Sequence, residues 1–207
     1  HFVDGLLEPH RGQVWARMAT ALRKLDGVVA VSEYCKAQMS ERCGFAEDDM
    51  CVIPSGLDLQ AFGSRVHQQP SPVLGYCARL SEEKGARVAV EAFAALRQRE
   101  GLSDLRLEMG GSVAPGGEQF VDELRASVPE GVRIASNLDT VDKAALLQGM
   151  SVFCVPGRTH EVSGLYVIEA LASGVPVVAA REGGAGELIR ETGGGLTYGA
   201  NDVSEMI

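Results

Sequence analysis

The sequence predicts an α/β protein in which one parallel β-sheet is covered by helices on both faces. From residue 73 to residue 198, short apolar runs typical of buried strands alternate with longer runs of helical spacing. Such alternation implies right-handed βαβ units. Glycine is abundant, at 25 of 207 residues, while aromatic residues make up only 5%, which suits a close-packed protein with many tight strand-to-helix turns.

The individual elements follow from these patterns. In the first part of the chain we expect helices at 13–25 and 33–42 and short strands at 27–31 and 51–54. In the second part the expected strands are 73–78, 105–109, 132–135, 151–155, 175–180 and 196–198. The helices expected between them are 82–99, 118–127, 140–149 (capped by Thr140), 164–172 and 185–190.

The expected sheet also predicts where a ligand binds. In open parallel sheets, ligands lie beyond the carboxyl ends of the strands. The turns after Ala78, Met109, Val155 and Ala180 are therefore the places to look for a site.

A polar segment at 64–72 that contains Pro70 and Pro72 is the best candidate for a linker. We expect residues 1–68 to be the incomplete end of one domain with the linker, and residues 69–207 to form a second domain with a truncated C-terminus. The chain begins without methionine and stops soon after a glycine turn, so we expect a fragment with both ends missing. Apolar surface should then be exposed in the first part.

Composition disfavours several classes of protein. A formal net charge of -9 argues against binding to nucleic acid, which needs clustered Lys and Arg. The apolar runs fall short of the roughly 18–20 residues that cross a bilayer. The five cysteines show no C-x-x-C spacing, so neither a disulfide framework nor a zinc site is indicated. We expect Cys77 and Cys154 to be buried thiols, and a cytoplasmic location fits best.

Two cations follow the first strand of the second part. Arg79 and Lys84 stand between a strand end and a helix start, where free N–H groups and the helix dipole already favour anions. Two cations at such a terminus suit a clamp for a diphosphate. The alternative is ordinary surface charge, with Lys84 paired to Glu82 or Glu83.

A second motif follows the strand at 151–155. Glu161 lies in the loop, and Gly164 and Leu165 open the next helix, where unpaired N–H groups can hold phosphate oxygens and glycine lets a ligand approach the backbone. Glu169 is the only charged residue from Gly164 to Ser173. Because a buried carboxylate without a partner is costly, it needs hydroxyl donors such as those of a ribose, unless it pairs with an arginine or points to solvent.

Other patterns are less informative. The glycine-rich turn at 181–187 could approach a ligand or could be a tight connection. No D-x-D pair, G-x-S-x-G elbow or Walker lysine loop is present, so a metal-held diphosphate is not indicated. The histidines His10, His67 and His160 lack metal-ligand spacing, and we predict no metal site.

Taken together, these segments resemble the retaining glycosyltransferases of the two-domain GT-B fold, family-4 type. The resemblance covers nearly the whole chain and rests on segments in the family's order and spacing: VVAVSEYCKAQM, VIPSGLDLQAF, LGYCARLSEEKG, LRLEMGG, FCVPGRTHEVSGLYVIEALASGVPVVAAREGGAGELI and GGGLTY. The E-x7-E pair of Glu161 and Glu169, followed by A-x-G-x-P-V-V, is the most specific signal. The resemblance implies that residues 69–207 are the Rossmann-like donor-binding half of that fold.

The resemblance also implies roles for particular residues in binding the donor. Arg79 and Lys84 would hold the donor diphosphate and stabilise the leaving nucleotide, with help from the N–H groups of Gly164 and Leu165. Glu169 would bind the ribose hydroxyls.

Further roles implied by the resemblance concern the sugar and the base. Glu161 would contact the transferred sugar near its anomeric centre, and the base would lie against the turns near Gly110 and Thr140. In this family a first-domain histidine precedes the "AVS" segment. His1 precedes Ser32 of this segment by about as many residues as the family's histidine does. It is either that histidine or an accident of where the fragment starts.

The function implied is transfer of a sugar from a nucleotide-diphosphate sugar to a sugar, lipid or glycan acceptor, with retention of configuration and without a metal or other cofactor. The resemblance allows peripheral membrane association through the missing part of the first domain, and the fragment by itself should be inactive. The sequence departs from the family in the turn Pro54-Ser55-Gly56, where P-N-G is usual, and in lacking the first domain's glycine-rich loop and the final crossing helix. One alternative is a non-catalytic nucleotide-sugar-binding fragment. The other is a sugar-nucleotide epimerase of the same fold, and the E-x7-E pair argues against this second alternative.

Overall fold

The computed structural model describes residues 9–63, 71–157, 161–199 and 202–207. The chain divides into two compact units, one ending at Ser55 and one beginning at Gly56. Most of the predicted linker, residues 64–70, lies outside the described residues.

The first unit is a small α/β assembly. Its elements are α1 (His10–Leu22), β1 (Val28–Ala30), α2 (Glu33–Cys43), the 3₁₀ turn η1 (Glu47–Asp49) and β2 (Met50–Val52). The strands β1 and β2 pair in parallel. Cys43, Phe45 and Met50 form a small buried core under α1 and α2, while Val29 and Ile53 are each 56% exposed.

The local sequence explains the ends of α2. The Ser32 hydroxyl accepts a hydrogen bond from the Cys35 N–H at 2.9 Å, which satisfies one of the free donors of the first turn. Gly44 ends the helix in the left-handed conformation, at φ 59°, which glycine adopts without a steric penalty. The helix expected at 33–42 is therefore found almost unchanged.

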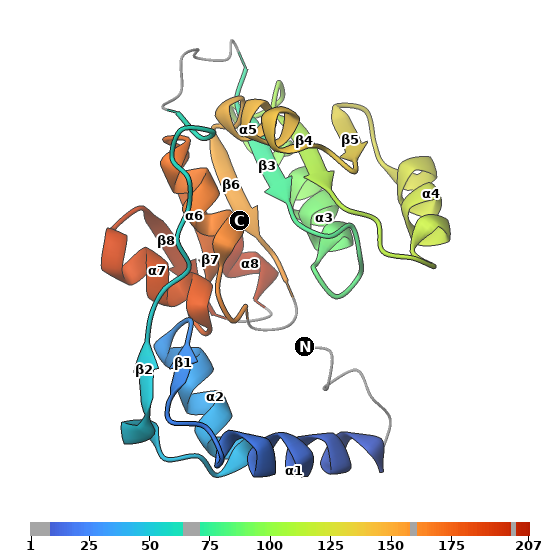
Figure 1. Ribbon diagram of the computed structural model, residues 1–207. Helices are drawn as coiled ribbons and strands as arrows, with labels where there is room; N and C mark the ends of the chain where they lie inside the picture. The colour runs from blue at the N-terminus through green and yellow to red at the C-terminus, as the bar shows by residue number, and fades with distance from the viewer. Residues whose placement is uncertain (1–8, 64–70, 158–160, 200–201) are drawn as a thin grey trace. The chain divides into compact units, whose positions relative to one another are not determined.

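The second unit has six strands and six helices in its described residues (Figure 1). The strands are β3 (Val73–Cys77), β4 (Arg106–Gly111), β5 (Val132–Ser136), β6 (Val152–Val155), β7 (Val177–Ala180) and β8 (Gly195–Tyr198). The helices are α3 (Ala86–Leu96), α4 (Glu118–Ser127), α5 (Thr140–Gln148), α6 (Leu165–Ala172), α7 (Gly184–Thr192) and α8 (Val203–Met206). All strand pairs are parallel, so the predicted α/β fold class is confirmed.

The strand order is β5-β4-β3-β6-β7-β8. The chain therefore builds outward from β3 through β4 to β5, then returns to the other side of β3 and builds outward again from β6. The order reverses between β3 and β6, and in such sheets this switch point is where ligands bind.

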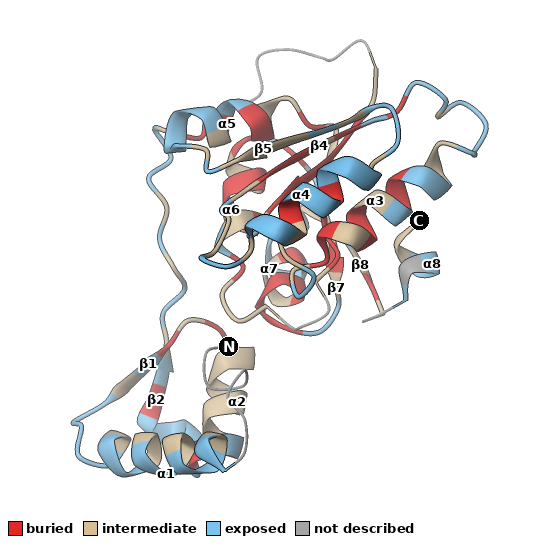
Figure 2. Ribbon diagram, turned by 90° about the vertical axis from the view of Figure 1, so that its right-hand side faces the viewer, coloured by how far each residue is buried: buried red, intermediate tan, exposed pale blue. Residues whose placement is uncertain are grey.

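Helices cover both faces of the sheet (Figures 1 and 2). On one face, α3 and α4 pack over Tyr76 and Leu107. On the other face, α5, α6 and α7 pack over Phe153 and Val177. All five residues of β3 are buried, as expected for a strand covered on both sides. The second unit begins at Gly56, before the strands of its sheet. Phe62, from this early segment, is buried in the core that contains Phe153 and Val177.

Several bounds and caps differ from the sequence predictions; the helix expected at 13–25, for example, is α1 (His10–Leu22). The helix expected from residue 82 begins at Ala86, because Gly85 adopts a left-handed conformation (φ 76°) that ends the preceding turn. Thr140 is the first residue of α5 and not its cap, since the Asp139 carboxylate accepts the Asp142 N–H at 2.8 Å. The short helix α8 was not predicted.

Cys77 and Cys154 are buried, as predicted. Burial raises the pKa of the Cys77 thiol to about 11 and that of Cys154 to about 12, so both thiols are protonated at neutral pH. Buried, protonated thiols of this kind pack as small apolar side chains.

We expect Gly85→Ala to be far more destabilising than Gly101→Ala, although both glycines have a left-handed backbone. A Cβ at Gly101 meets nothing within 4 Å, so only backbone strain of about 1–2 kcal/mol applies. A Cβ at Gly85 would overlap the carbonyl oxygen of Pro156, which adds a steric cost of about 1–3 kcal/mol. Urea unfolding of both variants would measure the difference, and equal losses would contradict it.

Candidate functional site

The predicted site residues leave the sheet at its switch point. Arg79 and Lys84 lie in the loop from β3 to α3, and Glu161 lies in the loop from β6 to α6. Because α3 and α6 cover opposite faces of the sheet, these two loops diverge from adjacent strand ends.

Backbone contacts fix the loop that carries the cations. The Tyr76 hydroxyl donates to the Arg79 carbonyl at 2.8 Å, and the Ser81 hydroxyl accepts the Lys84 N–H at 3.3 Å. Gly85 lies so close to Pro156 that no side chain fits between them. The close approach at Gly85 holds the two divergent loops together.

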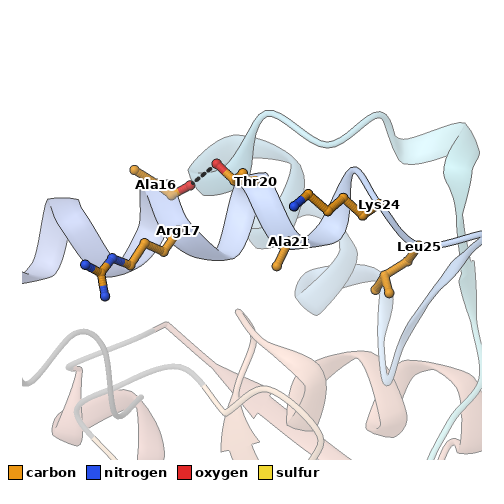
Figure 3. A pocket seen from close by; sticks show the side chains of 6 residues that line it. All are labelled: Ala16, Arg17, Thr20, Ala21, Lys24 and Leu25. Atoms are coloured by element: carbon orange, nitrogen blue, oxygen red, sulfur yellow. Dashed lines mark hydrogen bonds between the residues drawn. The ribbon is translucent and has the colours of Figure 1, made fainter.

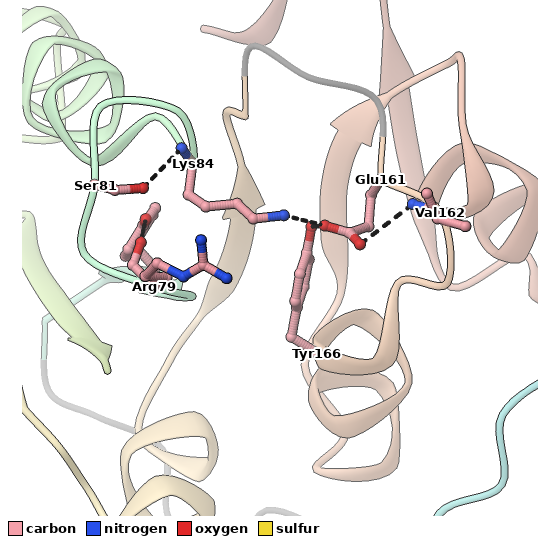
Figure 4. Close-up of polar contacts among 7 residues, drawn as sticks. Arg79, Ser81, Lys84, Glu161, Val162 and Tyr166 are labelled. Atoms are coloured by element: carbon pink, nitrogen blue, oxygen red, sulfur yellow. Dashed lines mark hydrogen bonds and ion pairs between the residues drawn. The ribbon is translucent and has the colours of Figure 1, made fainter. Parts of the chain in front are cut away.

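The Lys84 side chain extends from the β3–α3 loop to Glu161 on the β6–α6 loop (Figure 4). Its Nζ lies 2.7 Å from Glu161 Oε2, and the two side chains are only 15% and 13% exposed. The Tyr166 hydroxyl donates to the same oxygen at 2.7 Å, and the Val162 N–H donates to Oε1 at 3.2 Å. The partner of Lys84 thus comes from the neighbouring loop, and not from Glu82 or Glu83 as in the alternative that the sequence left open.

These donors keep Glu161 ionised. Burial by itself raises the pKa of this carboxyl, but the hydrogen bonds from Lys84 and Tyr166 and the charge of Lys84 outweigh it, so the pKa lies below its ordinary value. Burial and the neighbouring Glu161 charge raise the pKa of Tyr166, which remains a hydroxyl donor at neutral pH. Sequence reasoning missed Tyr166, since an aromatic residue in an apolar helix resembles a core residue.

Arg79 differs from Lys84 in its surroundings. Its side chain is exposed, and within the described part of the chain its guanidinium has no ion-pair partner. Figure 4 shows the Arg79 and Lys84 side chains extending from the same loop. One of the two predicted cations is thus available to an anion, and the other is already bound.

Glu169 is 5% exposed, which confirms that this carboxylate is buried. Its partner is Lys143 of α5, whose Nζ lies 2.5 Å from Glu169 Oε1 and 5.4 Å from the centre of the Phe62 ring. The sequence suggested a ribose, an arginine or solvent and did not identify Lys143. Lys143 is the only basic residue in an otherwise largely apolar helix, but only the packing of α5 beside α6 shows which carboxylate it meets.

The N-terminus of α6 has the expected free donors. In the described residues no acceptor is recorded for the N–H groups of Gly164 and Leu165. The structure gives a further reason for glycine at this position. Gly164 is left-handed (φ 63°), and a Cβ there would lie 3.0 Å from Leu188 and 3.3 Å from Ala185 of α7. Glycine serves the turn and the packing against α7.

The other predicted site residues take no part in these ion pairs and hydrogen bonds as far as the structure describes them. Gly110 is buried, and a Cβ there would overlap the Leu146 side chain. Thr140 is exposed at the start of α5. His1 lies outside the described residues.

The glycine-rich turn before α7 is a tight connection. Gly184 N–H donates to the Glu161 carbonyl at 2.6 Å, and a Cβ at Gly184 would overlap the Val162 carbonyl oxygen. A Cβ at Gly186 would overlap the Arg181 carbonyl oxygen. This turn therefore supports the backbone of the loop that carries Glu161.

Other features of the described residues bear on metal, membrane and small-molecule sites. No three His, Cys, Asp or Glu side chains among residues 9–63, 71–157, 161–199 and 202–207 come together as a metal site requires. None of the helices in those ranges is long and apolar enough to span a bilayer. An open hollow in the first unit follows one side of α1 (Figure 3) and contains none of the predicted site residues. It is lined by Ala16, Arg17, Thr20, Ala21, Lys24 and Leu25.

Comparison with solved structures shows the class of fold. The structure of Anabaena Alr3699/HepE in complex with UDP and glucose matches with a TM-score of 0.78 at 21% identity, over 97% of this chain and 56% of that chain. The C-terminal domain of the Francisella tularensis glycosyl transferase group 1 protein LpcC matches with a TM-score of 0.60 at 20% identity, over 73% of this chain and 84% of that one. The second unit thus has the fold of a GT-B C-terminal domain.

Family comparison identifies the chain more closely. Residues 71–207 match the family described as Glycosyl transferases group 1, and residues 1–61 match Glycosyltransferase Family 4. The chain belongs to the group 1 glycosyltransferases, and the predicted resemblance is confirmed.

Curated relatives agree with this assignment. A phosphatidyl-myo-inositol mannosyltransferase of Mycobacterium leprae is 29% identical over 75% of this chain and 41% of its own length. A glycogen synthase of Mycobacterium tuberculosis is 27% identical over 94% of this chain and 47% of its own length. The chain therefore spans less than half the length of these relatives.

We expect Lys143→Met to destabilise the second unit by about 2–3 kcal/mol, because Glu169 would be left buried without its charged partner. The double variant Lys143→Met with Glu169→Met should lose less, since no unpaired charge remains. Chemical unfolding would measure both. A single variant as stable as the unmodified chain would show that the pair has no structural role.

Proposed function

We propose that this chain binds the donor of a retaining glycosyltransferase, a nucleotide-diphosphate sugar, and that the diphosphate is held without a metal ion. The observation that carries the proposal is the placement of two cations and a helix N-terminus on the two loops of the switch point. Family membership supports the same reading.

The charges suit the parts of such a donor. Arg79, Lys84 and the free N–H groups of Gly164 and Leu165 offer positive charge and donors to a diphosphate. The cations and N–H donors that hold phosphate oxygens in this way also stabilise the negative charge of the leaving nucleoside diphosphate, the role that a metal ion has in other transferases.

The carboxylates suit hydroxyl groups. Glu169 would accept from the ribose hydroxyls, with Lys143 keeping it charged and oriented. Glu161 would accept from hydroxyls of the transferred sugar, while the turns near Gly110 and Thr140 face the base. Retention follows from the family, with the acceptor attacking on the face that the diphosphate leaves.

The names of relatives indicate the class of donor, a nucleotide-diphosphate sugar, but differ in its base and sugar. The Anabaena protein was solved with UDP-glucose, and a Mycolicibacterium smegmatis relative at 28% identity is a GDP-mannose-dependent mannosyltransferase. We therefore propose the nucleoside diphosphate as the common element and leave the acceptor among sugars, lipids and glycans.

We expect nucleoside diphosphate binding by the full chain to survive EDTA. Lys84→Ala should weaken binding of the diphosphate roughly tenfold to a hundredfold but change that of the bare nucleoside little, because the lost charge meets only phosphate. Glu169→Gln should weaken both ligands, because the ribose is common to them. Calorimetry with UDP, GDP, ADP and their nucleosides would measure these affinities.

The matched control is Arg87→Ala. Arg87 stands three residues beyond Lys84, on α3, and pairs with Glu82 and Glu123, so its removal takes away one positive charge without touching the clamp. Loss of binding in EDTA, or an Arg87→Ala effect as large as that of Lys84→Ala, would contradict the metal-free clamp.

A further inference from the structure

The bond between Lys84 and Glu161 conflicts with a simple phosphate clamp. Lys84 Nζ is 2.7 Å from the Glu161 carboxylate, with the two side chains 15% and 13% exposed, so a phosphate oxygen that draws Nζ toward itself has to compete with that carboxylate. Separating such a pair leaves a buried charge, which is costly unless other groups replace the lost contact. The free-energy cost of separating Lys84 from Glu161 therefore lowers the affinity for any diphosphate that binds Lys84.

Glu161 retains two donors when Lys84 leaves. The Tyr166 hydroxyl donates to the same oxygen as Lys84, also at 2.7 Å, and the Val162 N–H donates to the other oxygen at 3.2 Å. Hydrogen bonds to a charged acceptor are among the stronger ones in proteins. The carboxylate can therefore stay charged and in place without its lysine.

Tyr166 is itself held in position. It lies in the first turn of α6, and its ring packs against Phe153 of β6 with centroids 6.0 Å apart. Its hydroxyl has little freedom to leave Glu161, because the ring is packed into the core on that face of the sheet. Tyr166 is thus a fixed donor, in contrast to the flexible side chain of Lys84.

Arg79 offers a first contact for an incoming anion. It is exposed and extends from the same loop as Lys84, and among the described residues it has no ion-pair partner. A diphosphate that binds Arg79 would come within reach of Lys84. Because a diphosphate carries more charge than one carboxylate, it can compete with Glu161 for the lysine.

We propose, resting on the function proposed above, that the Lys84–Glu161 pair is a latch that a diphosphate opens, and that Tyr166 is the positioning residue that holds Glu161 when the latch opens. Lys84 then turns to phosphate, and Glu161 stays where a sugar hydroxyl can reach it. The latch also keeps both charges paired while the donor is absent.

The latch predicts effects of opposite sign for two neighbouring variants. In Glu161→Gln, Lys84 no longer has a carboxylate partner, so a sugar-free nucleoside diphosphate should bind more tightly. In Tyr166→Phe, Glu161 depends more strongly on Lys84, so opening the latch costs more and the same ligand should bind less tightly. A plain binding site, in which each residue only adds affinity, would give losses or no change for both.

The experiment is calorimetry of the full chain with UDP, GDP and ADP, without any sugar. We expect Glu161→Gln to bind the preferred diphosphate roughly fivefold to tenfold more tightly and Tyr166→Phe to bind it roughly threefold to fivefold less tightly. The matched control is Glu83→Gln, which removes one negative charge beside Lys84 from an exposed side chain. It should change the affinity less than about twofold, because exposed charges are well screened.

A double variant and a titration test the role of Tyr166. In a chain that already carries Glu161→Gln, Tyr166→Phe should have little further effect on diphosphate affinity, since the charge through which Tyr166 acts is gone. In the ligand-free chain, NMR titration should show a higher pKa for Glu161 in Tyr166→Phe than in the unmodified protein, because a hydrogen bond that favours the charged form is lost. A merely structural role for Tyr166 would move neither reading.

The outcomes separate this proposal from the function on which it rests. If none of the three diphosphates binds the unmodified chain, the proposed function fails and the latch with it. If a diphosphate binds and Lys84→Ala weakens it, but Glu161→Gln does not strengthen it beyond Glu83→Gln, the function stands and the latch is wrong. If Glu161→Gln strengthens binding while Tyr166→Phe changes neither affinity nor the pKa of Glu161, the positioning role of Tyr166 is wrong. Should Tyr166→Phe fail to fold, Glu161→Gln and its control still decide the latch.

Discussion

The reversal of strand order between β3 and β6 is the constraint on which the site depends. Because β4 and β5 extend the sheet on one side and β7 and β8 on the other, the connections after β3 and β6 cross opposite faces. Their first residues therefore diverge from adjacent strand ends. The cations come from one of these loops and Glu161 comes from the other, so groups distant in sequence meet at one place.

Close backbone contacts then fix how far apart the two loops lie. Gly85 rests against the carbonyl of Pro156, and Gly184 rests against that of Val162, in each case with no room for a Cβ. The first contact ties the cation loop to the end of β6, and the second supports the loop of Glu161 from α7. The glycines that the composition shows in abundance are used here as spacers of minimal size, and the reach of Lys84 to Glu161 follows from them.

Both carboxylates of the E-x7-E pair meet a lysine from another element. Glu161 binds Lys84, 77 positions away, and Glu169 binds Lys143, 26 positions away. An unpaired carboxylate would be costly at the buried Glu169, so the Lys143–Glu169 pair contributes to stability as well as to the site. A substrate that uses these groups must exchange contacts with them, and the energetics of binding then depend on which donors remain, such as Tyr166.

The sequence by itself determined the parallel α/β fold, the buried thiols and the buried position of Glu169, because spacing and apolar context are local properties of the chain. It also marked Arg79, Lys84 and Glu161 as residues near strand ends. The tertiary structure decided their partners. Lys143 meets Glu169 only because α5 packs beside α6, and Lys84 meets Glu161 only because β3 and β6 are neighbours in the sheet. Pairing depends on distances between elements that no local pattern encodes, and that is why the sequence identified the charges without identifying what each one binds.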